Sequence, residues 1–236
     1  MMESDNLIKK RIENINNKIR LAAQKSERDF SEIKLVLVTK RQPIERIYSA
    51  LKNGIEYIGE NRIQEIEEKL PLLKNKIKEF HFIGHLQSNK INKLLALRPK
   101  LIHSLDKYTT IEKMNNHLIE LNLIQDILIQ VNTSFEINKS GIEPDKTVDF
   151  CNSLIKFKNI RIKGLMTIGK LTDNRNEIRA GFKLLKELFD TLKDVTLENM
   201  EMKYLSMGMS SDFDIAIEEG ANIIRIGSAI LGARKN

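Results

Sequence analysis

The segment Lys34-Leu35-Val36-Leu37-Val38-Thr39 contains four consecutive apolar residues and is followed at once by Lys40. A strand with one wet face alternates apolar and polar side chains, whereas a parallel strand covered on both faces is apolar throughout. We therefore predict a buried parallel strand at Lys34–Thr39. Parallel neighbours need a crossover connection. A helical pattern, Pro43–Asn53, follows directly, and Pro43 stands where the first turn of a helix tolerates a missing N–H. This unit indicates an α/β fold.

The same alternation continues along the chain. The further predicted strands are short and β-rich: Tyr57–Gly59, Phe80–Gly84, Leu101–Ser104, Asp126–Asn132, Arg161–Thr167, Tyr204–Met207 and Asn222–Ile226. The further helical patterns are amphipathic: Arg62–Lys74, Asn89–Ala96, Tyr108–Leu121, Pro144–Lys156, Asn174–Leu192 and Asp212–Glu219. Eight strands and seven helices predict a closed (β/α)8 TIM-type barrel, preceded by a lead-in helix at Asn6–Lys25. An open doubly wound sheet also alternates, but no Gly-x-Gly-x-x-Gly opens the first βα unit, so the barrel is favoured.

Length and composition are those of a globular protein. The 236 residues suit one barrel, and we expect residues 1–236 to form a single domain, although two ordinary domains would also fit. The single cysteine excludes an intramolecular disulfide, and no cluster of Cys and His has zinc-site spacing, so we expect no metal. The apolar runs are too short to span a bilayer, and the polar N-terminus is not a secretory signal. We expect a cytoplasmic protein with no membrane partner.

The net charge of +7 raises the question of nucleic acid. The lysines are interleaved with acidic residues on helical segments, as in Glu65-Ile66-Glu67-Glu68-Lys69, and tryptophan is absent. No aromatic stacking motif lies among the basic residues. Solvated helix faces therefore explain the charge better than a nucleic-acid surface does.

The loops after the last two predicted strands have the chemistry of a phosphate site. One loop reads Met207-Gly208-Met209-Ser210-Ser211-Asp212, and the other contains Gly227-Ser228. The glycines allow tight turns, and Ser210 and Ser211 stand where they could cap the following helix. Helix starts attract anions, and barrels often bind phosphate after strands seven and eight. The alternative is that these residues form only a capped helix start and a turn.

Lys40 and Arg225 suggest what carries the phosphate. A lysine at the end of an apolar strand would be partly desolvated, which lowers its pKa and makes its amine a better nucleophile for a carbonyl. The alternative is an ordinary surface lysine. Arg225 alternates with Ile224 and Ile226 and should project into the barrel if the isoleucines face the helices. A buried arginine near a phosphate loop and across from a lysine suits pyridoxal 5′-phosphate.

The histidines and the cysteine are weaker signals. His81 and His103 lie in predicted strands, where histidines satisfied by core hydrogen bonds are common, and His117 lies in a helix. His85 is at a loop mouth but has no evident carboxylate or nucleophile partner. Cys151 is predicted to be a small core residue.

At these residues the chain resembles the pyridoxal phosphate homeostasis protein family, which are single-domain relatives of the alanine racemase barrel with pyridoxal phosphate fold type III. The matching segments run in order over nearly the whole chain: 35–40, 59–65, 81–90, 132–134, 139–141, 164–167, 205–210 and 225–228. Three positions depart from the family pattern, namely Thr39, the run Arg41-Gln42-Pro43, and His85.

The resemblance implies a role for each site residue. Lys40 would form the Schiff base with pyridoxal 5′-phosphate, and Arg225 would face the pyridine nitrogen. Asn61 and Met207 would lie beside the cofactor. The phosphate would be held by three residues: Ser210, Gly227 and Ser228.

The resemblance also implies a carrier rather than an enzyme. Racemases of this fold add a catalytic tyrosine from a second, mostly β domain, whereas this sequence ends at Asn236, ten residues after the last predicted strand. We therefore expect a monomer that buffers the cofactor or delivers it to pyridoxal phosphate-dependent apo-enzymes, with little or no turnover. The first alternative is an amino-acid racemase with a one-base mechanism on Lys40. The second is a barrel that binds another phosphate ligand, or a nucleic-acid binder.

Overall fold

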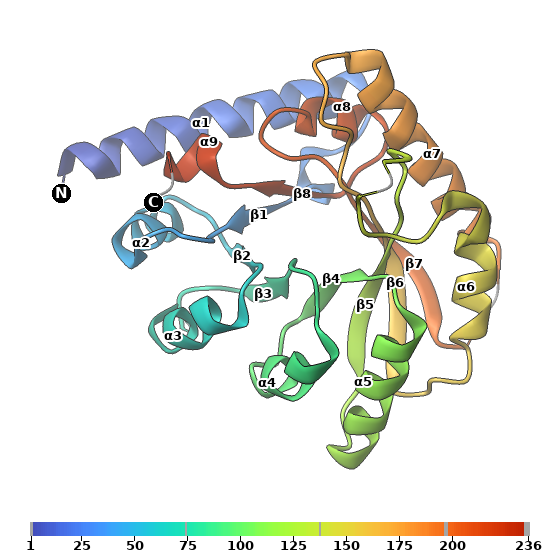
Figure 1. Cartoon of the computed structure of the whole chain (residues 1–236). Coiled ribbons are helices and arrows are strands. Elements are labelled where there is room, and N and C mark those ends of the chain that lie inside the picture. The colour runs from blue at the N-terminus through green and yellow to red at the C-terminus, as the bar shows by residue number, and fades with distance from the viewer. Residues whose placement is uncertain (1, 74, 137, 196–197, 234–236) are drawn as a thin grey trace.

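Eight parallel strands close into a barrel in which each strand pairs with its neighbours in chain order and β8 pairs with β1 (Figure 1). The computed structural model describes residues 2–73, 75–136, 138–195 and 198–233. The strands are β1 (Lys34–Val38), β2 (Tyr57–Glu60), β3 (Glu79–Phe82), β4 (Leu101–Leu105), β5 (Gln125–Gln130), β6 (Ile160–Met166), β7 (Met200–Ser206) and β8 (Ile223–Ile226). The predicted (β/α)8 barrel is confirmed.

The helices surround the strands (Figure 1). They are α1 (Met2–Lys25), α2 (Ile44–Lys52), α3 (Ile63–Leu73), α4 (Ile91–Ala96), α5 (Tyr108–Glu120), α6 (Thr147–Ser153), α7 (Arg175–Lys193), α8 (Phe213–Glu218) and α9 (Ser228–Leu231). Three short 3₁₀ helices are present as well: η1 (Phe30–Glu32), η2 (Ser88–Lys90) and η3 (Pro144–Lys146). Within the described residues, none of these helices is both long enough and apolar enough to cross a membrane.

Several predicted element bounds differ from the structure. Strand β7 begins at Met200 instead of Tyr204, because its first half alternates exposed charged residues with buried ones and lacks the apolar run of the other strands. The predicted helix Pro144–Lys156 is divided into η3 and α6. Helix α9 was not predicted, since four residues are too few to show a helical period. The predicted end of the third helical pattern at Lys74 lies outside the described residues.

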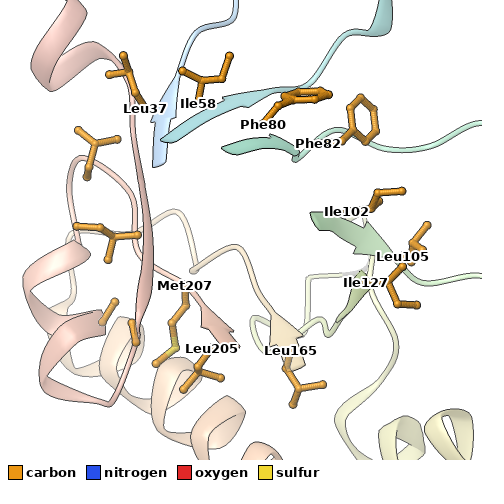
Figure 2. Close-up of a cluster of buried hydrophobic side chains, with 14 of the residues drawn as sticks. Leu37, Ile58, Phe80, Phe82, Ile102, Leu105, Ile127, Leu165, Leu205 and Met207 are labelled. Carbon is orange, nitrogen blue, oxygen red and sulfur yellow. The ribbon is translucent and has the colours of Figure 1, made fainter. Parts of the chain in front are cut away.

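The outward-facing side chains of the strands form the larger hydrophobic core. Figure 2 labels ten members of this core, which lie in the strands or, for Met207, directly after one: Leu37, Ile58, Phe80, Phe82, Ile102, Leu105, Ile127, Leu165, Leu205 and Met207. All are buried. Because side chains alternate along a strand, the intervening positions point into the barrel.

The barrel interior is partly apolar and partly polar. A second, smaller cluster of buried apolar side chains fills one layer, with Tyr57 and Tyr204 packed against it; its members are Val36, Leu101, Leu128, Met166 and Ile223. His81, His103, Ser206 and Arg225 are also buried on inward-facing positions of their strands. A stack of side-chain layers is usual inside such barrels, but bulky apolar residues normally dominate it.

The lead-in helix α1 is an integral part of the packing. Its isoleucines at 8, 12, 15 and 19 have the spacing of one helical face, and all four are buried. That face contacts α2, α8 and α9, so α1 covers the side of the barrel where β8 joins β1.

We expect Ile19→Ala to destabilise the protein by about 2–4 kcal/mol, because Ile19 is 1% exposed and its truncation leaves a cavity. Leu21 on the same helix is 66% exposed, and Leu21→Ala should change stability by less than about 0.5 kcal/mol. Urea unfolding followed by circular dichroism measures both. Equal effects of the two variants would mean that α1 does not pack as described.

Candidate functional site

The predicted site lies at the mouth of the barrel, by which we mean the carboxyl ends of the strands and the loops after them. β1 ends at Val38, Thr39 is fully buried, and Lys40 is half-buried in the turn that follows. The next residue, Arg41, has a φ of +53°, in the left-handed region that side chains other than glycine seldom adopt. Such a conformation persists only where neighbouring contacts hold it.

A clamp of three charged side chains, Glu60, Glu65 and Lys69, holds the backbone on both sides of Lys40. Lys69 Nζ donates to the carbonyl of Thr39 at 2.9 Å, to Glu60 Oε2 at 3.0 Å and to Glu65 Oε2 at 2.7 Å. The same Glu65 oxygen accepts the backbone N–H of Arg41 at 2.7 Å. Residues 39 and 41 are thus both tied to the clamp, which restricts where Lys40 can lie.

The clamp also determines the ionisation of Glu65. Burial raises the pKa of this carboxyl, but the hydrogen bonds from Lys69 and from the Arg41 N–H outweigh burial, so the pKa lies below its ordinary value of 4.5. Glu65 is therefore a carboxylate throughout the neutral range.

Arg225 projects into the barrel, as predicted from strand alternation. Ile224 and Ile226 lie in the outer core, and Arg225 is only 5% exposed. Its Nη1 donates to Ser206 Oγ at 2.7 Å and its Nη2 to the carbonyl of Thr167 at 2.8 Å. Burial lowers the pKa of the guanidinium to about 10, partly opposed by the charge of Asp212. At neutral pH Arg225 therefore carries its charge inside the barrel.

The loop after β7 turns tightly but differs from the prediction in one respect. Gly208 has a φ of +92°, and an added Cβ there would lie 2.6 Å from the Cβ of Ala216, so only glycine fits. Neither Ser210 nor Ser211 caps α8. Asp212 occupies the N-cap position, and its Oδ1 accepts the N–H of Met209 at 2.6 Å. The predicted serine cap is wrong because this carboxylate closes the turn, and Ser210 remains half-buried within it.

The loop after β8 meets both neighbouring strand ends. Gly227 precedes α9, and its carbonyl accepts from the N–H groups of Ile230 and Leu231. The N–H groups of Ser228 and Ala229 thus precede the first bond of this helix. A Cβ on Gly227 would lie 3.3 Å from the Cβ of Val38, and the Arg225 N–H donates to the Gly208 carbonyl at 3.0 Å. The ends of β7, β8 and β1 therefore adjoin.

Two further predicted site residues, Asn61 and Met207, differ in whether their side chains reach the mouth. Asn61, directly after β2, has a buried Oδ1 with no hydrogen-bond partner among the described residues. A buried acceptor without a donor is costly, so this atom marks a place where a polar ligand group would fit. Met207, in contrast, is fully buried in the outer core (Figure 2), and its side chain does not reach the mouth. Only its backbone could contact a ligand there.

The mouth is hollowed on the side of strands β3 to β6, and none of the predicted site residues lines this hollow. A cavity of about 250 Å³ is lined by His85, Ser104, Gln130, Asn132 and Lys139, among others. Lys139 Nζ donates to the carbonyl of Gly169 at 2.9 Å, which links the loop after β5 to the loop after β6. In the part of the chain that the structure describes, no three His, Cys, Asp or Glu residues gather closely enough to hold a metal ion.

The clamp was not predicted. A Glu65–Lys69 pair at i,i+4 is visible in the sequence, but such pairs usually lie on solvated helix faces. Glu60 is a charged residue at the end of the short strand β2, and nothing local indicates that it is fully buried. The clamp arises because α3 packs next to the β1 turn, which is a tertiary contact.

The fold and the site define a (β/α)8 barrel with charged and polar side chains at its mouth, and the comparisons with known proteins identify its family. The family model "Alanine racemase, N-terminal domain" matches residues 11–235, so the chain belongs to this family. Within it, the chain belongs to the pyridoxal phosphate homeostasis proteins. It is 37% identical to the pyridoxal phosphate homeostasis protein of Aquifex aeolicus over 225 residues, which cover 95% of this chain and 97% of that protein.

Two solved structures are similar over nearly their whole length. An unknown protein from Bifidobacterium adolescentis is 30% identical, with a TM-score of 0.91 over 97% of this chain and 96% of that one. PipY of Synechococcus elongatus, whose structure was solved with PLP bound, is 29% identical, with a TM-score of 0.77 over 91% of this chain and 99% of that one.

We expect Glu65→Gln to destabilise the protein by about 1 kcal/mol at neutral pH, since it removes a charge-assisted hydrogen bond. Because the pKa of Glu65 is lower folded than unfolded, its contribution is complete above about pH 5 and is lost as the pH falls through the folded value. Urea unfolding from pH 7 to pH 3 measures this, with the exposed Glu68→Gln on the same helix as control. A difference from wild type that stays constant down to pH 3 would contradict the assignment.

Proposed function

We propose that this protein binds pyridoxal 5′-phosphate at the mouth of its barrel and serves intracellular homeostasis of the cofactor by buffering or delivering it. The observation that supports this best is the buried, charged guanidinium of Arg225 at the same mouth as Lys40 and two glycine–serine turns. A lysine, a cationic donor and a phosphate cradle are what this cofactor needs. The PLP bound to PipY, a structural relative, supports the same ligand.

The residues present fit the cofactor's groups. Lys40 Nζ would condense with the aldehyde carbon, forming a C=N bond and releasing one water. Ser210, Gly227 and Ser228 would hold the phosphate through hydroxyl and backbone N–H groups. Asn61 would supply its unsatisfied Oδ1 to a donor beside the ring. Met207 would contribute only backbone.

Arg225 decides what the bound ring can do. Its guanidinium keeps its proton at neutral pH because even its lowered pKa is about 10. A guanidinium only donates hydrogen bonds, so a pyridine nitrogen that faces it must accept and stay unprotonated. Bound pyridoxal phosphate supplies an electron sink for amino-acid chemistry, and an unprotonated ring nitrogen weakens that sink.

The tyrosines give no second base. The chain has four, and all lie in the described part. Tyr57 and Tyr204 surround the Lys34 ammonium at the amino end of the barrel. Tyr48 donates to the carbonyl of Leu72, and the ring of Tyr108 packs against that of Phe157 at a tilt of 48°. We therefore propose a carrier with little or no turnover.

The location, oligomeric state and recipients of this carrier belong to the same proposal. We propose that it acts in the cytoplasm as a monomer, that residues 1–236 form one domain, and that pyridoxal phosphate-dependent apo-enzymes receive the cofactor. The name shared by its curated relatives, pyridoxal phosphate homeostasis protein, supports the homeostatic role.

We expect wild-type protein mixed with pyridoxal 5′-phosphate to become yellow, and borohydride reduction to leave one stable adduct on Lys40. Lys40→Ala should lose the visible band and bind the cofactor about 100-fold more weakly, since the covalent bond would contribute on the order of 3 kcal/mol. Absorbance titration and peptide mass spectrometry measure this. Lys158→Ala, at an exposed lysine between α6 and β6 and so at the amino end of the barrel, is the control and should behave as wild type.

Two outcomes would overturn the assignment of Lys40. One is a wild-type protein that stays colourless at saturating cofactor. The other is an adduct that maps mainly to surface lysines and is unchanged in Lys40→Ala.

We expect the loaded protein to exchange the α-proton of alanine with deuterated solvent no faster than free pyridoxal phosphate does, within about threefold, because none of the four tyrosines is placed to act as a second base. Proton NMR of the amino acid over time measures the exchange. Fast exchange that disappears in Lys40→Ala would instead support a racemase that works with one base.

A further inference from the structure

A chain of buried polar side chains crosses the inside of the barrel behind Arg225. Ser206 Oγ, which accepts from Arg225, lies 2.9 Å from His103 Nδ1. His103 Nε2 lies 2.9 Å from His81 Nδ1, and His81 Nε2 lies 3.0 Å from Glu79 Oε2. We call these five residues the relay. It runs from the mouth to the amino end of the barrel, through β8, β7, β4 and β3.

The Glu79 end of the relay is a fixed negative charge. The hydrogen bond with His81 lowers the pKa of this carboxyl most, burial opposes it, and the Lys34 ammonium 3.1 Å away lowers it further, to about 2. Lys34 itself lies over the rings of Tyr57 and Tyr204, at 4.9 Å and 5.2 Å from their centroids. Glu79 is therefore an acceptor only.

Both histidines are neutral at pH 7. Burial lowers the pKa of His81, opposed by Glu79, while the charges of Lys34 and Lys100 lower it further. Burial lowers the pKa of His103 well below its usual value, as do His81 and Arg225. The contact between the two rings requires one donor and one acceptor, which two neutral rings provide.

The carboxylate then fixes every proton in the relay. His81 must donate from Nε2 to Glu79, so its Nδ1 accepts from His103 Nε2. His103 Nδ1 is left as an acceptor, and the Ser206 hydroxyl donates to it. With its proton turned toward His103, the Ser206 oxygen presents a lone pair to Arg225. All hydrogen bonds point the same way, from Arg225 to Glu79.

We propose that His103, backed by His81 and Glu79, is a positioning residue that orients the Ser206 hydroxyl and thereby holds the Arg225 guanidinium in place at the mouth. The expected effect on cofactor binding rests on the proposed function. Apolar side chains could fill these interior positions without a polar network, as five buried apolar side chains do elsewhere inside the barrel. Buried polar chains of this kind cost stability relative to a packed apolar core, which is consistent with a functional role.

The ligand-free protein tests the protonation pattern directly. With ¹⁵N-labelled histidine, NMR should show His81 and His103 as neutral rings, both protonated on Nε2, from pH 8 to pH 7. A ring protonated on Nδ1, or charged at pH 7, would overturn the relay. This result does not depend on cofactor binding or on any variant folding.

A pair of variants tests the positioning of Arg225. His103→Leu removes both ring nitrogens, and we expect pyridoxal phosphate to bind about 10-fold more weakly with a shifted visible band, since a charge-assisted contact of Arg225 loses its orientation. Glutamine can accept from Ser206 and donate to His81, so His103→Gln should bind within about threefold of wild type. Met166→Leu, an interior change of similar volume outside the relay, is the control.

The outcomes separate the two proposals. If wild type binds and His103→Leu binds equally with an unchanged band, the positioning role is overturned. If the wild type itself does not bind pyridoxal phosphate, the proposed function is wrong. The NMR experiment on the ligand-free protein still tests the protonation pattern of the relay. Should His103→Leu not fold, Ser206→Ala replaces it, and the same loss of affinity is expected.

Discussion

The charge of Arg225, buried inside a closed ring of strands, is the constraint on which the rest of the site depends. An isolated ion in such a place costs several kcal/mol, and a hydrogen-bonded environment must offset that cost. The barrel provides the Ser206 hydroxyl, the Thr167 carbonyl and, at longer range, the carboxylate of Asp212. Ser206 is in turn held by two neutral histidines and Glu79, so the interior is organised around one guanidinium.

Barrel closure brings this charge to Lys40. The two residues lie near opposite ends of the sequence, but β8 pairs with β1, and Gly227 packs against Val38. Helix α1 covers that seam from outside. On the β1 side, the clamp of Glu60, Glu65 and Lys69 fixes the backbone around Lys40. Two separate polar networks therefore hold the guanidinium of Arg225 and the backbone around Lys40 at one mouth.

The barrel fold and the inward direction of Arg225 could be predicted from local sequence patterns. The apolar run at 35–38 indicated a parallel strand. The alternation of side chains along β8 correctly predicted that Arg225 points into the barrel. The clamp and the relay could not be predicted, because both depend on strand register and helix packing, which no single segment encodes. His81 and His103 were correctly expected to be satisfied core residues, yet their mutual contact requires β3 beside β4. The predicted serine cap is wrong because Asp212, and neither serine, occupies the N-cap position of α8, and its side chain bonds back to the N–H of Met209.

The protonation state of the bound ring tests the central claim most directly. With pyridoxal 5′-phosphate labelled with ¹⁵N in the pyridine ring, NMR of the loaded protein reports whether that nitrogen carries a proton. A charged Arg225 facing the ring predicts the shift of an unprotonated pyridine that stays constant from pH 6 to pH 8. A pyridinium shift, or a nitrogen that titrates as it does in free solution, would contradict the account.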